Sequence, residues 1–138
     1  MRRTIGLSAL ALIAGIALVA DGGWLAKAQQ QTIKRTDLLK VDLPEIKGSQ
    51  MNLWVADIAP GGETGRHTHP TPRFVYVLEG AVTLEMDGKP SQTFKAGQAF
   101  VEMPNMVHNF KNASTTEPAK GLGFQYAAEG QALQVSTP

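Results

Sequence analysis

The chain has 138 residues, with 13 basic and 12 acidic side chains, no cysteine, and 43% hydrophobic residues. This near-neutral balance excludes the strongly basic surface that nucleic-acid binding requires, so we expect no nucleic-acid partner. The lack of cysteine excludes disulfides, thiolate metal ligands and a lipoprotein acylation site. The fold must therefore be held together by packing.

The first 28 residues have the order of regions found in a secretory signal peptide. Met1-Arg2-Arg3 is basic, residues 5–20 form an apolar run, and Ala26-Lys27-Ala28 fits the small-residue pattern before a cleavage site. We predict a helical signal peptide at 1–28 and a periplasmic or secreted protein. The single domain at 29–138 would carry 10 basic and 11 acidic residues. An uncleaved segment would instead anchor the protein to a membrane.

The rest of the chain shows strand patterns separated by turns, without clear helical periodicity. Strands are predicted at 53–58, 74–78, 81–86, 91–95, 99–102, 107–110 and 122–126, with further strand-like sequence at 32–41. Asp87-Gly88 predicts a hairpin turn. About eight short strands in one domain favour an all-β sandwich, jelly roll or barrel. The ends, 29–31 and 131–138, are predicted to be loose tails.

All three histidines lie in two short, turn-rich stretches. His67 and His69 form an H-x-H pair, which on a strand projects both imidazoles to the same face. His108 can complete the set from another strand. This pattern predicts one metal site with His67, His69 and His108 as ligands, and the alternative is a metal-free barrel that keeps them for packing or hydrogen bonding.

Residues 61–80 resemble the first cupin motif, G-x5-H-x-H-x3-E-x6-G, and residues 97–112 resemble the second, G-x5-P-x-G-x2-H-x3-N. The resemblance implies a cupin-like jelly-roll β-barrel whose interior binds a divalent metal ion, commonly manganese, iron, nickel, zinc or copper. Through the family we also expect a homodimer, with the 32–41 stretch covering a neighbour's sheet edge. The positions that match both motifs in spacing are Gly61, His67, His69, Gly80, Gly97, His108 and Asn112.

The chain departs from the first motif at its acidic ligand, where Arg73 stands. Glu63, Glu79 and Glu102 are the acidic residues near the motifs, and the sequence does not choose which of them replaces that ligand or pairs with Arg73. In the second motif Met103 and Asn105 replace the proline and glycine, although asparagine also accepts a left-handed turn conformation.

Arg73 and Trp54 each have two readings. Arg73 either binds an anionic group of a substrate, as guanidinium geometry favours, or forms an ordinary salt bridge at the surface or at an interface. Trp54 lines a pocket or a subunit contact. Asn112 is predicted to be structural, capping a turn near the second motif. The aromatic residues Phe74, Tyr76, Phe100, Phe110 and Phe124 are predicted to pack in the core or on the outer sheet surface.

Two functional classes follow from these observations. The first is a metal-dependent oxygenase or isomerase acting on a small anionic organic molecule. The second is a non-catalytic cupin module that binds a small ligand or a metal ion. The sequence offers no convincing general base, and no Ser-His-Asp or Cys-His arrangement that would identify a reaction.

Overall fold

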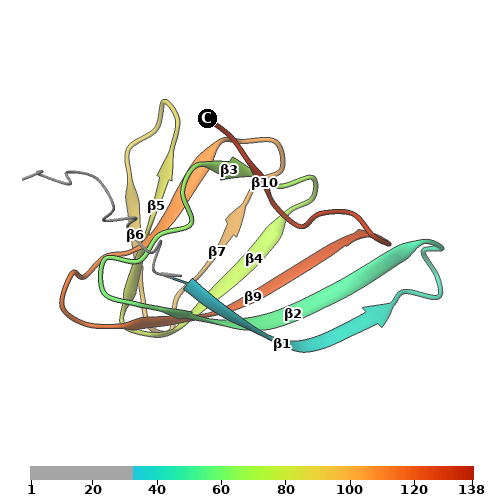
Figure 1. Cartoon of the computed structure of the whole chain (residues 1–138), viewed down its shortest axis with the longest axis horizontal. Helices are drawn as coiled ribbons and strands as arrows, with labels where there is room; N and C mark the ends of the chain where they lie inside the picture. The colour runs from blue at the N-terminus through green and yellow to red at the C-terminus, as the bar shows by residue number, and fades with distance from the viewer. Residues whose placement is uncertain (1–32) are drawn as a thin grey trace, which may run out of the picture.

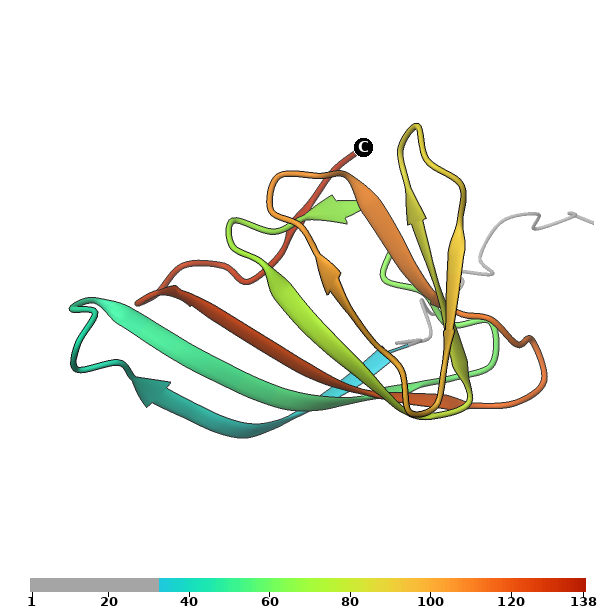
Figure 2. The same cartoon turned by 180° about the vertical axis from the view of Figure 1, so that it is seen from behind.

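The computed structural model describes residues 33–138 and shows two five-stranded antiparallel sheets that face each other (Figures 1 and 2). One sheet has the strand order β1-β2-β9-β4-β7, and the other has the order β10-β3-β8-β5-β6. No helix in this part of the chain is long and apolar enough to cross a membrane. The strands are β1 (Ile33–Asp42), β2 (Ser49–Ile58), β3 (His67–Thr68), β4 (Arg73–Glu79), β5 (Ala81–Met86), β6 (Gln92–Lys95), β7 (Ala99–Glu102), β8 (His108–Asn112), β9 (Ala119–Ala128) and β10 (Val135–Ser136).

The described residues therefore confirm the predicted all-β jelly-roll class. The predicted signal peptide at 1–28 lies outside them. The predicted strand at 32–41 exists as β1, but it pairs along its length with β2 of the same chain.

The core lies between the two sheets, because alternate side chains of each strand point inward. In β4, Val75 and Val77 are buried while Phe74 and Tyr76 are exposed, and β5 contributes the fully buried Val82. Phe110 of β8 joins the same apolar cluster. The predicted aromatic positions thus divide between the core and the outer face of the first sheet.

Turn residues with positive φ fix how the chain passes from one sheet to the other and how it reverses within a sheet. Gly80, between β4 and β5, has φ = 69°, and a Cβ there would lie 2.8 Å from the carbonyl oxygen of Pro118, so only glycine fits. The predicted hairpin joins β5 to β6 with Gly88 at φ = 70°. Asn105 adopts the predicted left-handed conformation, with φ = 59°.

The outer face of the first sheet is apolar and exposed. Its large exposed side chains come from β1, β9, β4 and β7 and from the turn after β7: Leu39, Val41, Phe74, Tyr76, Leu78, Val101, Met103 and Tyr126. Exposed apolar side chains of this kind are common at protein interaction sites, and the expected homodimer stays a prediction.

The prediction of a loose C-terminal tail is wrong. Val135 and Ser136 form β10, which pairs with Thr68 and His67 of β3. The segment before β10 also reaches the barrel interior, where the carbonyl oxygen of Leu133 accepts hydrogen bonds from buried side chains. The sequence of this tail has no strand pattern, and its order comes from these nonlocal contacts.

Candidate metal centre

The structure brings the three histidines together inside the barrel. His67 of β3 stands directly opposite His108 of β8 in the strand register, and His69 follows β3 on the same face as His67. All three side chains are buried. Their ring centroids are 4.4 to 4.8 Å apart.

Backbone carbonyls fix the orientation of every imidazole. The Nδ1–H groups of His67, His69 and His108 donate to the carbonyl oxygens of Gly65 (2.8 Å), Leu133 (2.9 Å) and Met106 (2.8 Å), respectively. A carbonyl can only accept, so each Nδ1 carries the proton and each Nε2 of a neutral ring presents a lone pair. This is the arrangement by which proteins orient histidines that ligate metals.

The Nε2 atoms converge on one point. The Nε2 atoms of His69 and His108 are 3.1 Å apart, and the Nε2 of His67 is buried without any hydrogen-bond partner in the described chain. Buried polar atoms without a partner are rare and costly. A divalent cation would satisfy all three lone pairs at once, so the donor set fits a metal ion.

Glu102 completes the cluster and supplies a fourth ligand atom that the three-histidine prediction lacked. Its Oε2 lies 2.9 Å from the Nε2 of His69, and the four ligand atoms all lie within 4.8 Å of one another. Glu102 belongs to β7, where it is the register partner of Arg73 in β4. The carboxylate absent from position 73 is therefore supplied by the neighbouring strand.

The other two acidic candidates lie elsewhere. Glu63 accepts a hydrogen bond from Asn109, and Glu79 pairs with Lys120 at 3.1 Å. Asn112 is structural, as predicted, because its amide donates to the carbonyls of Ala59 and Glu117 and its oxygen accepts from the backbone of Ser114.

The cluster perturbs the ionisation of its own members. Burial lowers the pKa of His67 to about 4. Burial also lowers the pKa of His69, with Arg73 adding to the effect, whereas for His108 the interaction with Glu102 outweighs burial and raises the pKa. For Glu102, burial acts to raise the pKa, but the contacts of the carboxylate with the imidazoles of His108 and His69 and the charge of Arg73 outweigh burial and hold the pKa well below its usual range. Glu102 is thus an anion whose charge is balanced inside the barrel.

Arg73 is buried behind this carboxylate and fixed in place. Its Nε donates to Gln125 Oε1 (3.0 Å), its Nη2 donates to the carbonyl of Leu133 (3.1 Å), and its Nη1 lies 3.7 Å from Glu102 Oε2. The salt-bridge reading of Arg73 is therefore correct in part. Gln125 and Leu133 could not be predicted from the sequence, because only nonlocal pairing places them here.

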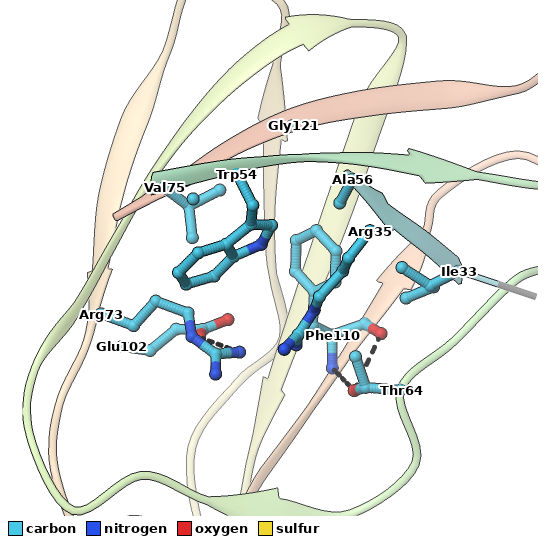
Figure 3. Close-up of a pocket in the computed structure, with 11 residues that line it drawn as sticks. Ile33, Arg35, Trp54, Ala56, Thr64, Arg73, Val75, Glu102, Phe110 and Gly121 are labelled. Atoms are coloured by element: carbon cyan, nitrogen blue, oxygen red, sulfur yellow. Dashed lines mark hydrogen bonds and ion pairs between the residues drawn. The ribbon is translucent and has the colours of Figure 1, made fainter. Parts of the chain in front are cut away.

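A small cavity of about 30 Å³ adjoins the cluster (Figure 3). Glu102 is shared by the cavity and the histidine cluster, and Arg73, Trp54 and Arg35 also line the cavity. Trp54 therefore lines a pocket in the interior, which is one of the two positions predicted for it. Its ring lies so close to β9 that a Cβ on Gly123 would be 2.4 Å from it.

Comparison with known proteins agrees with this architecture. A family model described as a cupin domain matches residues 54–123, which is 70 of the 138 residues. The chain belongs to the cupin superfamily. The cupin is 30% identical over 92 residues to germin-like protein 1 of Brassica napus, a match that covers 63% of this chain and 44% of that protein. It therefore spans less than half the length of this curated relative.

Solved structures share the cupin fold at low sequence identity. A cupin-like protein from Thermotoga maritima is 23% identical with a TM-score of 0.57, over 72% of this cupin and 77% of that chain. The DMSP lyase DddQ from Ruegeria pomeroyi DSS-3 is 18% identical with a TM-score of 0.63, over 81% of this cupin and 54% of that chain. At these identities the similarity concerns the fold alone.

Proposed function

We propose that this cupin binds one divalent transition-metal ion through His67, His69, His108 and Glu102, and uses it in a reaction on a small anionic organic molecule. The observation that carries the proposal is the convergence of three Nε2 lone pairs, oriented by carbonyls, on one buried carboxylate. Three imidazoles and one carboxylate suit manganese, iron, nickel, zinc or copper. When bound, such an ion supplies Lewis-acid or redox chemistry at coordination positions that the protein leaves open.

The residues around the cluster limit what kind of reaction is supported. Glu102 is the only carboxylate that lines the described cavity, and its lowered pKa makes it a weak base. Acid–base chemistry by protein groups alone is therefore poorly supported, and oxygenation or isomerisation at an ion is favoured. Arg73 would hold Glu102 in its ionised form and keep positive charge beside the substrate.

Metal content is the direct test. Untagged full-length protein purified without chelator is expected to contain about one transition-metal ion per chain by elemental mass spectrometry. The double variant His67→Ala/His108→Ala should lose the ion, and Glu102→Gln should weaken binding. Glu79→Gln is the matched control, because Glu79 is exposed and pairs with Lys120 instead. Wild-type protein that stays metal-free and resists loading with Mn²⁺, Fe²⁺, Ni²⁺ or Zn²⁺ would refute the proposal.

A non-catalytic binding module is the second candidate, favoured by the small cavity and by the lack of a free general base. The two classes are separated by an oxygen electrode and product analysis with metal-loaded protein. The panel should contain β-diketones, small carboxylates and, because one solved relative is named as a DMSP lyase, DMSP. Turnover that depends on His108 supports the enzyme, and saturable binding without turnover supports the module.

We also propose export, which the N-terminal sequence supports through its basic start, apolar run and Ala26-Lys27-Ala28. N-terminal sequencing of protein from the cell envelope or medium should find Gln29 as the first residue. A membrane-bound chain that begins at Met1 would indicate an anchor instead.

A further inference from the structure

Two guanidinium groups meet in the cavity beside the metal centre. The Cζ atoms of Arg35, on edge strand β1, and of Arg73, on β4, each lie 5.2 Å from the ring centroid of Trp54. Figure 3 shows both groups turned toward the space below the indole. Arg35 is exposed whereas Arg73 and Glu102 are buried, so the cavity runs from the surface to the cluster.

Among the side chains that line this cavity the positive charges outnumber the negative ones, although Asp37 of β1 also attracts Arg35 from outside the lining. Arg35 and Arg73 carry two positive charges, and Glu102 is the one carboxylate among the lining residues. Glu102 is also committed to the cluster through its 2.9 Å contact with His69. A bound divalent ion would add to the excess positive charge. Because charges in the protein interior are weakly screened, these positive charges would attract an anionic ligand strongly.

Arg35 has donors to offer that anion. Its Nη2 donates to Gln134 Oε1 at 2.9 Å, and no other acceptor for its guanidinium is found within residues 33–138. Arg73, by contrast, is held by Gln125 and Leu133, which leaves Nη1 to face Glu102. A planar guanidinium with two adjacent donors binds a carboxylate in a bidentate manner.

We propose that Arg35 and Arg73 together bind the carboxylate group of a small organic acid, with Arg35 as the direct bidentate anchor. About 10–15 Å³ of such volume holds one water molecule, so the cavity of about 30 Å³ has room for the two oxygens of a carboxylate but not for a whole substrate. The rest of the ligand must extend past Ile33 and Thr64 at the Arg35 side. The apolar walls formed by Ala56, Val75 and Phe110 suit a short hydrocarbon body.

This inference deepens the proposed function, on which it rests for what happens at the metal, but the binding step is testable without turnover. Acetate and pyruvate are the probes, with acetamide and pyruvamide as their neutral counterparts. Each is titrated calorimetrically into full-length protein whose metal content has been measured, before and after treatment with chelator. The variants are Arg35→Gln and Arg35→Lys. The control is Lys34→Gln, which removes the same charge from the next, exposed residue of β1 outside the cavity.

We expect the carboxylates, and not the amides, to bind wild type and Lys34→Gln. Arg35→Gln should bind them roughly tenfold to a hundredfold more weakly, and Arg35→Lys should fall between, because it keeps the charge but not the fork. Equal binding to wild type and Arg35→Gln, or equal binding of acid and amide, would overturn the inference even if metal is present. Arg35-dependent binding to a protein that takes up no metal would uphold the inference and refute the metal proposal.

Discussion

Gly123 and Gly121 make a matched pair for testing how β9 holds Trp54 over the cavity. Both glycines are buried on the same face of β9. A Cβ at Gly123 would lie 2.4, 2.5 and 2.7 Å from three atoms of the Trp54 ring, whereas a Cβ at Gly121 would meet Val75 Cγ1 at 3.7 Å. Gly123→Ala therefore forces the indole to retreat by about 1 Å, and Gly121→Ala does not.

The size of the effect follows from these contacts. Overpacking a core lowers the free energy of unfolding by about 1–3 kcal/mol. Replacing glycine with alanine raises it by about 0.4–1 kcal/mol, because the unfolded chain has less conformational entropy. The cavity beside Trp54 gives the ring some space to move into. We therefore expect Gly123→Ala to lower the free energy of unfolding by about 1–2 kcal/mol, and Gly121→Ala to leave it unchanged or raise it by up to about 1 kcal/mol.

Urea unfolding followed by tryptophan fluorescence measures this difference. Trp24 and Trp54 are the two tryptophans of the chain, so a Trp24→Phe background assigns the signal to Trp54. Measurements at one protein concentration with chelator present keep dimerisation and metal binding from shifting the midpoint. Equal midpoints for the two alanine variants would show that Trp54 does not lie against β9 as described.

Three further predictions concern the cluster and the surfaces around it. Because the pKa of His67 is lowered from 6.5 to about 4, the unfolded metal-free chain binds more protons than the folded chain between these pH values. Stability should therefore fall by about 3 kcal/mol as the pH is lowered from 6.5 to 4, and urea unfolding of His67→Gln at several pH values should show a smaller loss. Truncation after Gln131 removes the Leu133 carbonyl that accepts a hydrogen bond from His69, so metal affinity should become about 10–100-fold weaker, as measured by competition with a chelating dye. Truncation after Gln134 removes β10 but keeps that carbonyl. The protein truncated after Gln134 should therefore bind the metal more tightly than the protein truncated after Gln131. The exposed apolar face of the first sheet should pack against a second copy of the chain. Light scattering after size exclusion should therefore give a dimer for wild type and for the control Thr93→Lys on the other sheet, and a monomer for Tyr76→Lys/Val101→Glu. A monomeric wild type would refute the predicted dimer.

The sequence predicted what depends on local pattern. Alternation and turn residues identified the described strands other than the two short ones, β3 and β10, and the H-x-H spacing with His108 identified the imidazole cluster. Sequence could not choose Glu102 over Glu63 and Glu79, because the choice depends on the register between β4 and β7, which places Glu102 opposite Arg73. The register is a property of the folded sheet rather than of either strand alone.

Arg35 and Leu133 were missed for the same reason. Arg35 lies in a strand whose residues are nearly all exposed, so its sequence gives no sign that the guanidinium reaches Trp54. Leu133 contributes a backbone carbonyl, which no side-chain pattern can reveal. An alternation test on β7 would have helped, because Glu102 falls on the inward side with Phe100 while Val101 is exposed.

The fixed Nδ1 protons of the three histidines have a consequence for how an ion would enter the site. Since each imidazole keeps its Nδ1 proton in place, only a proton at Nε2 competes with the ion, and His108, whose pKa is raised by Glu102, is the histidine on which that proton binds most readily. Wherever the pH leaves that proton bound, loading would exchange it for the cation. Calorimetric heats of loading should accordingly change with the ionisation enthalpy of the buffer, and a compartment that becomes acidic would empty the site by the same exchange run backward.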